Sequence, residues 1–430
     1  MKPIQLLLAL LLLSACVSDR VANDSLDEIA KDYVQMTLEI GEREPGYVDA
    51  YYGPEEWAEA AKATPRSLPA LAKEASSLAA RTTAINPAEL DPLSVRRRAF
   101  LLAQLRAAST RLRMIQGEKL SFAEEAQGLF GVRVELKPLA SYDPVLDRIA
   151  ALVPGRGALA DRVDAFQDRF TIPKERLKPV FDAAIEECKR RTAAHIQLPP
   201  GERFTMEFVT GKSWSGYNYY QGDYNSLIQI NTDLPIRISR AVDLGCHEGY
   251  PGHHALNMLL EQRLTKERGW IEYSVYPLYS PQSLIAEGTA NYGIDLAFPG
   301  EQRLQYETRA LYPLAGLPTG EAQKYLALQE AMTDLQGARF TIAREYLEGR
   351  INRVQAVELT QKYQLVSKKR AEQLIDFTEQ YRSYVINYGL GQDMARAYVE
   401  AAGTTPEARW AAMERMISEP TLPSDLIVRP

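Results

Sequence analysis

The chain has 430 residues with 46% hydrophobic and 25% charged side chains, and its formal net charge is -6. These values are typical of a globular protein with two or three domains, or with one large body of two lobes. Basic and acidic residues are interspersed, which argues against the basic face that a nucleic-acid-binding protein needs. We therefore expect no nucleic-acid partner.

The first residues are typical of a bacterial secretion signal. A positive start precedes an almost wholly apolar run over residues 6–13, which is too short to span a membrane. Leu-Ser-Ala-Cys at residues 13–16 looks like a lipobox, in which Cys16 becomes the lipid-modified N-terminus; an ordinary signal with a chance cysteine is the alternative. We expect a signal peptide over residues 1–15, a polar tether over residues 16–24, and membrane attachment through acyl chains.

The residue that follows Cys16 indicates which membrane carries the lipid. Because Val17, rather than Asp, follows Cys16, we expect the lipid to lie in the outer membrane with the body facing the periplasm. Cys188 and Cys246 then remain, and both lie in helical patterns with no spacing that favours a bond between them. We expect two free, buried thiols.

Residues 25–198 are predicted to form successive helices, because apolar side chains recur every three or four positions, as they do over residues 26–40. Residues 92–115 form a long amphipathic pattern whose other face carries arginines that we expect to be solvated. The loop at residues 44–54, rich in turn formers and tyrosine, either walls a pocket or joins two helices. His195 lies alone at a helix end, where no metal role is expected.

The periodicity changes after Gly201. Residues 204–210 and 225–231 alternate as strands do, and an aromatic, glycine-bearing connection at residues 214–222 separates them. We expect these strands to form a small antiparallel β-sheet over residues 203–231. Helical patterns resume at residues 239–264 and continue at residues 283–297, 318–349, 355–380, 391–402 and 406–418.

The predicted fold class is therefore mainly α. We expect an N-terminal helical lobe over residues 25–200 and a catalytic lobe over residues 201–430 that contains the small antiparallel sheet. The second lobe also contains the residues that are best suited to carry chemistry.

Three of the four histidines of the chain lie within the eight residues His-Glu-Gly-Tyr-Pro-Gly-His-His at positions 247–254. Neutral imidazole is the commonest metal ligand, and a Glu directly after a ligand His is the general-base position of helical zinc sites. A catalytic zinc ion needs three protein ligands and an open position for water. The box predicts that His247 is one ligand and that Glu248 is the base.

The second histidine ligand is a choice between two neighbours. On an unbroken helix, His247 and His254 would share a face, whereas His253 would point about 120° away. Pro251 and Gly252 interrupt the helix, however, and a bulge or kink there could bring either histidine round. Both His253 and His254 stay candidates, with the other one beside the metal site or in contact with the substrate.

A third ligand is expected from a following helix. Glu287 lies in Ala-Glu-Gly-Thr-Ala-Asn-Tyr at residues 286–292, where small residues allow two helices to approach closely. With two histidines and this glutamate as Zn²⁺ ligands, Glu248 would polarise a water whose pKa the metal lowers to about 7.

The box, followed by Glu-Gly-x-Ala-x-Tyr, resembles a family of bacterial lipoproteins of unknown function that is related to glutamate-ligand (gluzincin-like) zinc metallopeptidases. Further segments are similar to that family: the loop at residues 45–54, the aromatic segment at residues 214–222, Ile-Asn-Thr-Asp-Leu-Pro at residues 230–235 and Tyr-Gly-Leu-Gly at residues 388–391. The likeness therefore spans most of the mature chain.

The resemblance implies a largely α-helical metallopeptidase fold with a small sheet beside the active-site helix. It implies that His247, a second histidine and Glu287 bind zinc, and that Glu248 acts as general base and acid. The box is two residues longer than the familiar His-Glu-x-x-His, so the resemblance does not decide between the two later histidines.

Other residues are candidates for contacts with the substrate. Tyr388, in the late Tyr-x-x-Gly element of the family, is our first choice to stabilise an oxyanion, with Tyr384 and Arg382 as alternates. Tyr250 and Asn231 are further candidates for substrate binding. The strand at residues 225–231 could be an edge strand that pairs with an extended peptide.

The function predicted from the sequence is a zinc-dependent peptidase that acts on short peptides at the bacterial envelope. The alternatives are a metal-dependent hydrolase of other amide or ester bonds, and a metal-binding lipoprotein without catalysis. The sequence does not specify the substrate or the oligomeric state.

Overall fold

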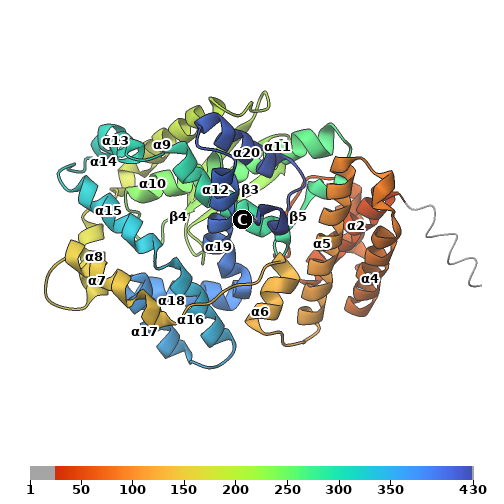
Figure 1. The fold of residues 1–430 in the computed structure, drawn as a ribbon, viewed down its shortest axis with the longest axis horizontal. Coiled ribbons are helices and arrows are strands. Elements are labelled where there is room, and N and C mark those ends of the chain that lie inside the picture. Colours follow the sequence, from red (N-terminus) through yellow and green to blue (C-terminus); the bar gives the residue numbers. More distant parts are fainter. Residues whose placement is uncertain (1–24, 429–430) are drawn as a thin grey trace, which may run out of the picture.

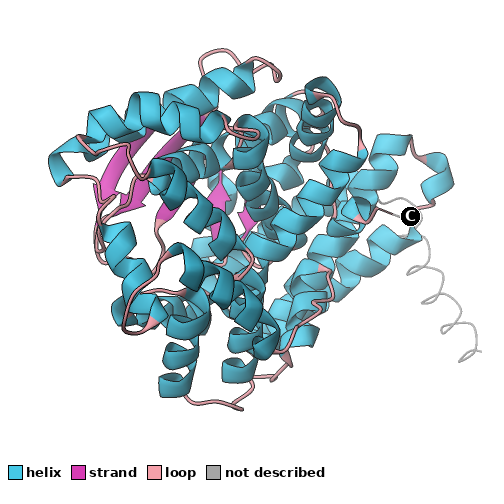
Figure 2. Ribbon diagram, turned by 60° about the vertical axis from the view of Figure 1, so that its left-hand side comes forward, coloured by secondary structure: helices cyan, strands magenta, loops and turns pink. Residues whose placement is uncertain are grey.

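The structure is a computed structural model that describes residues 25–428. The predicted signal peptide, the polar tether and Cys16 lie outside this range. Within it, helices make up most of the molecule and the few strands lie among them, which confirms the predicted mainly α fold (Figures 1 and 2). None of the helices in residues 25–428 is both long enough and apolar enough to cross a membrane.

The helices that precede the sheet follow one another closely. Cap residues set several of their starts: the Ser25 hydroxyl accepts from the backbone amide of Glu28, and the Asp91 carboxylate accepts from the amides of Leu93 and Ser94. The helices are α2 (Leu26–Arg43), α3 (Glu55–Ala63), α4 (Leu68–Ala84), α5 (Pro92–Ile115), α6 (Phe122–Glu125), α7 (Asp143–Leu152), α8 (Leu159–Asp168) and α9 (Leu177–Ala193).

Two arginines of α5 correct the expectation of a solvated face. Arg97 is 4% exposed, and its Nε lies 2.6 Å from Oε1 of the buried Glu272. Arg111 is also buried and pairs with Glu44. The helix lies between other elements, so part of its charged face is covered and neutralised by carboxylates from distant segments.

Among the helices of the second half, α12 (Pro281–Ala297) lies near the centre of Figure 1 and packs against α19 (Ile386–Ala401). A Cβ on Gly288 of α12 would lie 2.4 Å from the carbonyl carbon of Gly391, so the two helices meet backbone to backbone where glycines permit it. The helices are α10 (Ser239–Leu244), α11 (His253–Leu260), α12 (Pro281–Ala297), α13 (Gln302–Tyr306), α14 (Tyr312–Ala315), α15 (Ala322–Thr333), α16 (Gln336–Leu347), α17 (Arg353–Gln364), α18 (Lys368–Tyr381), α19 (Ile386–Ala401) and α20 (Pro406–Ser418).

The predicted small sheet is present, with one strand more than expected. Its order is β2 (Arg203–Val209), β4 (Asn225–Asn231) and β3 (Gly216–Gly222). β3 and β4 are antiparallel, whereas β2 and β4 are parallel. The aromatic connection is thus itself a strand, and β4 is central, with both edges paired. The prediction that β4 offers a free edge to a peptide is wrong.

The tyrosine-rich loop after α2 also contributes a strand. β1 (Val48–Tyr51) pairs antiparallel with β5 (Val275–Pro277), and Asp49 of β1 lines the large cavity described below. The segment therefore joins elements and also walls a pocket.

The hydrophobic core consists of two clusters. The larger includes Phe181 of α9, Ile228 of β4 and Leu256 of α11, and the smaller includes Tyr33 of α2 and Leu284 of α12. Both clusters draw on residues from before and after position 200. The predicted boundary between two lobes stays a prediction.

Cys188 and Cys246 form a disulfide bond, with their Cα atoms 5.4 Å apart. The expectation of two free thiols is wrong. The bond links α9 to the residue that precedes His247, and these two segments also pack together through Ile185 and Gly245. The two cysteines are 58 residues apart in the chain, and no sequence pattern reveals that their helices meet.

Candidate metal centre

The histidine box lies across a break between two helices. After α10, one π-helical turn, η5 (Gly245–Gly249), carries His247 and Glu248, and the chain then turns extended at Tyr250 before α11 begins at His253. A Cβ on Gly252 would lie 1.8 Å from the carbonyl oxygen of His247. Only glycine permits this close crossing, which brings the start of α11 back beside η5.

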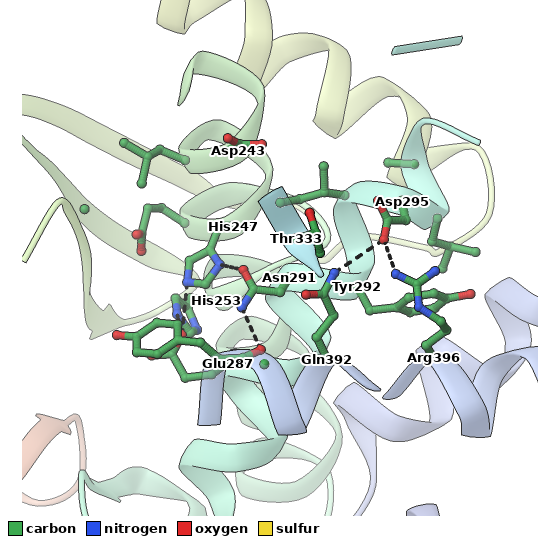
Figure 3. Close-up of a pocket in the computed structure, with 18 of the residues that line it drawn as sticks. Asp243, His247, His253, Glu287, Asn291, Tyr292, Asp295, Thr333, Gln392 and Arg396 are labelled. Carbon is green, nitrogen blue, oxygen red and sulfur yellow. Dashed lines mark hydrogen bonds and ion pairs between the residues drawn. The ribbon is translucent and has the colours of Figure 1, made fainter. Parts of the chain in front are cut away.

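His247, His253 and Glu287 form the candidate metal-binding group. One ligand atom from each residue lies within 4.8 Å of the others. Oε2 of Glu287 is 3.2 Å from Nε2 of His247 and 3.8 Å from Nε2 of His253. In Figure 3 the three side chains point toward one another from η5, α11 and α12.

His254, the other candidate for the second histidine ligand, is not part of this group. It is completely buried on the other side of α11, where Nδ1 lies 2.7 Å from Oγ of Ser226 and Nε2 lies 3.0 Å from Oε2 of Glu202. Consecutive residues on a helix point about 100° apart, so His254 faces the sheet when His253 faces Glu287.

Neighbouring polar groups orient the ligands. Nδ1 of His247 lies 3.0 Å from Oδ1 of Asn291, whose Nδ2 donates to the carbonyl of Tyr388. This hydrogen bond fixes the proton on Nδ1 and leaves Nε2 free to coordinate. Tyr384 donates to Oε1 of Glu287 at 2.8 Å, while the buried Oε2 accepts no well-directed hydrogen bond and faces the imidazoles.

Glu248 lies beside the group with a free carboxylate oxygen. The residue is 3% exposed, and its Oε2 has no hydrogen-bond partner among the described residues. A Cβ on Gly216 of β3 would lie 2.5 Å from Oε1, so the glycine leaves the room that the carboxylate occupies. Burial raises the pKa of Glu248 to about 7, against the opposing effect of His247.

In the metal-free protein, His253 and Glu287 have the protonation states that a divalent cation needs. Burial opposes protonation of His247, but Glu287 and Glu248 outweigh it and raise its pKa, so this residue must release a proton when an ion binds. Burial, reinforced by the charge of His247, lowers the pKa of His253 to about 4, so this imidazole is neutral at pH 7. Burial alone would raise the pKa of Glu287, but the close contact with His247 and the hydrogen bond from Tyr384 lower it below its ordinary value, so the carboxylate is ionised. Two imidazole nitrogens and one carboxylate form a typical three-ligand set for catalytic zinc.

Tyr388 and Tyr384, which lie one helical turn apart near the start of α19, make different contacts. The ring of Tyr388 stacks beside His247, with 6.5 Å between the ring centroids, and lines the cavity. Burial raises the pKa of Tyr388 well above 10, so its hydroxyl remains a proton donor at neutral pH. Tyr384 is engaged with Glu287 and positions this ligand.

Three predicted contact residues do not face the site. Tyr250 is fully buried and donates to Glu202. Asn231 donates to the carbonyl oxygens of Lys212 and Trp214 and so holds the loop before β3. Arg382 is paired with the buried Glu125. None of the three is among the residues that line the cavity, and each makes a structural contact instead. Their roles in substrate binding stay predictions.

The metal-binding group opens into a cavity of about 1470 Å³. Figure 3 shows part of its wall, with Thr333, Gln392 and Arg396 on the side away from the histidines. Sequence reasoning missed several lining residues, namely Asp49, Tyr217, Asn291, Arg339 and Arg370. Only Asn291 left a signal that could have been used, because it lies one helical turn after Glu287, on the same face.

The described region holds one more histidine, and it lies apart from the metal-binding group. His195 lines the same large cavity, but its ring stacks on Trp410 with centroids 4.9 Å apart.

Comparisons with known proteins give distant similarities of structure. No protein-family profile matches the sequence, and no curated protein matches it. A crystal structure of a protein from Colwellia psychrerythraea, proposed to be a lipoprotein, aligns with a TM-score of 0.48 and 15% identity, covering 82% of this chain and 69% of the other. An M32 carboxypeptidase from Deinococcus radiodurans R1 aligns with a TM-score of 0.39 and 14% identity, covering 91% and 88%. These values assign neither a family nor an activity to this chain.

Proposed function

We propose that this protein is a zinc-dependent peptidase in which His247, His253 and Glu287 hold the metal and Glu248 is the general base. The observation that carries the proposal is the convergence of the three ligand atoms within 4.8 Å, beside a buried carboxylate oxygen of Glu248 that has no partner in the described part of the chain. A site built only to bind a metal would not need this second carboxylate.

Each residue has a defined task in hydrolysis. Zinc, when bound, would polarise the scissile carbonyl and lower the pKa of the attacking water to about 7. Glu248 takes a proton from this water and gives it to the leaving amine, and so acts first as general base and then as general acid. Tyr388 donates a hydrogen bond to the carbonyl oxygen as negative charge develops there.

The size of the cavity favours a substrate of several amino-acid residues. Its volume of about 1470 Å³ exceeds the ~300–1,000 Å³ that is usual for small-molecule pockets. Aromatic rings and charged groups both line it, including Trp214, Tyr217 and Tyr381. Short peptides, which offer backbone amides together with mixed side chains, are therefore the substrate class that we propose.

We further propose that the protein is anchored through Cys16 and acts in the periplasm, at the outer membrane. The lipobox-like sequence is one support. The Cys188–Cys246 bond is a second, because disulfide bonds are typical of oxidising compartments outside the cytoplasm.

The test of the mechanism is Glu248→Gln. The amide keeps the size of the side chain but cannot accept the proton, so hydrolysis of a mixed peptide library should fall by about 10²–10⁴-fold. The zinc content, measured by elemental analysis, should stay at the wild-type level. Glu330→Gln, at another glutamate of the cavity wall, is the matched control and should keep wild-type activity.

The same preparations distinguish the substrate classes. N-acyl amides and esters are assayed next to the peptides, and faster turnover of either would replace the peptidase assignment by a hydrolase of that bond. Full activity of the Glu248→Gln variant would contradict the mechanism.

A further inference from the structure

Two arginines of the cavity wall, Arg339 and Arg370, have no carboxylate partner within residues 25–428. Among the other arginines of the same wall, Arg303 pairs with Asp243 and Glu307, and Arg396 pairs with Asp295. Arg409 has no carboxylate partner in the described region either, but its Nε donates to the carbonyl of Gly403. A guanidinium taken out of water without an opposite charge is unfavourable, so a pair of them facing one cavity calls for an anionic occupant.

Arg339, on α16, lies close to the metal-binding group. Its guanidinium carbon is 5.2 Å from the ring centroid of Phe377 and 5.6 Å from that of Tyr388, the ring that stacks beside His247. Its Nε is buried without a hydrogen-bond partner. Aromatic faces hold the planar group in place but leave its N–H donors unused.

Arg370, on α18, lies toward the Glu248 side of the cavity. It donates from Nη2 to the hydroxyl of Ser215 at 2.8 Å, and Ser215 precedes Gly216, the residue that borders the Glu248 carboxylate. Its other side-chain partner is the neutral amide oxygen of Gln373. Burial lowers the pKa of Arg370 to about 10, and the positive charges of Arg240, Arg339 and Arg237 add to this effect.

On the basis of the proposed peptidase function, we propose that Arg339 and Arg370 form a subsite that binds a carboxylate of the substrate. Guanidinium groups match carboxylates through paired, charge-assisted hydrogen bonds. The carboxylate has two possible sources in a peptide. It is either the free C-terminus, placed beyond the scissile bond, or the side chain of an Asp or Glu residue.

The activity test uses four peptides of one length: a free acid and its C-terminal amide, each with Glu or with Gln at one internal position. We expect the wild-type protein to cleave one carboxylate-bearing member at least about tenfold faster, in kcat/KM, than its neutral counterpart. The acid-versus-amide pair reports the C-terminus, and the Glu-versus-Gln pair reports the side chain. In Arg339→Gln and Arg370→Gln the preference should fall to about twofold or less, mainly through KM.

Two control variants separate the subsite from general damage. Arg339→Lys keeps the charge and should retain part of the preference. Arg396→Gln removes an arginine of the same wall that is already paired with Asp295, and it should keep the wild-type preference. Equal losses for charged and neutral peptides in Arg339→Gln and Arg370→Gln would overturn the proposal.

A binding measurement makes the inference testable even if no peptide is cleaved, a result that would count against the proposed function alone. Calorimetric titration of the Glu248→Gln protein compares N-acetyl-Ala-Ala and N-acetyl-Ala-Glu-amide with their neutral amide and Gln counterparts. One carboxylate ligand should bind about tenfold or more tightly than its neutral counterpart, and Arg339→Gln should remove the difference. Equal affinities within both pairs would contradict the subsite.

Discussion

His253 and His254 are adjacent in sequence, but their environments differ, so that one is a candidate ligand and the other makes structural contacts. His253 faces Glu287, whereas His254 links α11 to the sheet through Ser226 and Glu202. The difference arises from the break at Gly252, which sets the rotation of α11 relative to η5. A second histidine ligand therefore depends on where a helix restarts, and helix periodicity in the sequence does not contain that information.

We predict that His253→Ala loses the metal and that His254→Ala keeps it. His253→Ala removes a nitrogen ligand, so zinc measured by elemental analysis after dialysis should fall well below one ion per chain. His254→Ala leaves Ser226 and Glu202 with unsatisfied buried groups, so the free energy of unfolding should fall by about 1–3 kcal/mol while zinc is retained. Loss of zinc from His254→Ala alone would contradict this assignment.

The Glu202 carboxylate predicts a pH dependence of stability. Burial would raise its pKa, but hydrogen bonds from His254, Lys189 and Tyr250 outweigh burial and lower the pKa from 4.5 to about 2. Because the folded-state pKa lies below the unfolded-state value, the stabilisation is present above about pH 4.5. It disappears as the pH falls toward 2, and it amounts to about 3 kcal/mol.

The measurement is urea unfolding of the wild-type protein and Glu202→Gln between pH 3 and pH 7. The variant should be less stable at pH 7, and the difference should shrink as the pH falls below about 4.5. A difference that stays constant over this range would show that the ionised carboxylate is not the source of the stability.

The candidate site residues differ in whether a short sequence motif is enough to suggest their role. His247, Glu248 and Glu287 could be proposed from the sequence because each lies in a short motif whose spacing has a chemical meaning, and the structure brings His247 and Glu287 together with His253. Tyr250, Asn231 and Arg382 also lie in or near such motifs, yet their side chains bind Glu202, backbone carbonyls and Glu125. Partners that lie far away in sequence decided their roles, so no local pattern could reveal them.

At the scale of elements, the contact between α12 and α19 positions the third ligand. Glu287 precedes Gly288, whose backbone lies against Gly391, and Asn291 on the same helix reaches the Tyr388 carbonyl. The close approach therefore places the ligand, the residue that orients His247, and Tyr388 in one fixed arrangement.

We predict that Gly288→Ala is destabilising. A Cβ at this position would lie 2.4 Å from the backbone of Gly391, so the helices must separate, at a cost of about 1–3 kcal/mol. The shift would also move Glu287 and weaken zinc binding, measured by competition with a chelator. The control is Gly320→Ala, where no atom lies within 4 Å of the new Cβ and neither property should change.

Elements of the fold were predictable where their pattern is local. The helical periodicity and the two alternating strands were visible in the sequence, and the mainly α class is confirmed. β3 was missed because its glycines and asparagine are typical of turns, although its three tyrosines favour a strand. The buried pairs of Arg97 and Arg111 with Glu272 and Glu44 were missed because they depend on which helices cover α5.

At the scale of the whole molecule, the disulfide bond joins α9, in the first half of the chain, to the turn that carries His247, a proposed metal ligand. In the chain-entropy account, a bond between cysteines 58 residues apart lowers the conformational entropy of the unfolded chain. This raises the free energy of the unfolded state by about 4 kcal/mol. It also fixes the helix that supports the candidate site against the remainder of the core.

We predict that a variant with both Cys188→Ala and Cys246→Ala has a free energy of unfolding lower by about 2–4 kcal/mol. Urea unfolding at one protein concentration, with and without a reducing agent, checks this expectation. The reducing agent should lower the midpoint of the wild-type protein and leave that of the double variant unchanged. Equal midpoints for all four samples would contradict it.

The same disulfide bond affects how the candidate site would bind a metal ion. The backbone at His247 is held covalently through Cys246, the imidazole is held by Asn291, and the crossing at Gly252 fixes the start of α11. Most of the rotational freedom of the ligands is thus removed when the chain folds, before any ion arrives. Ion capture then requires little further ordering, so the metal-free protein should already be native in shape, unlike small domains that fold only around their zinc.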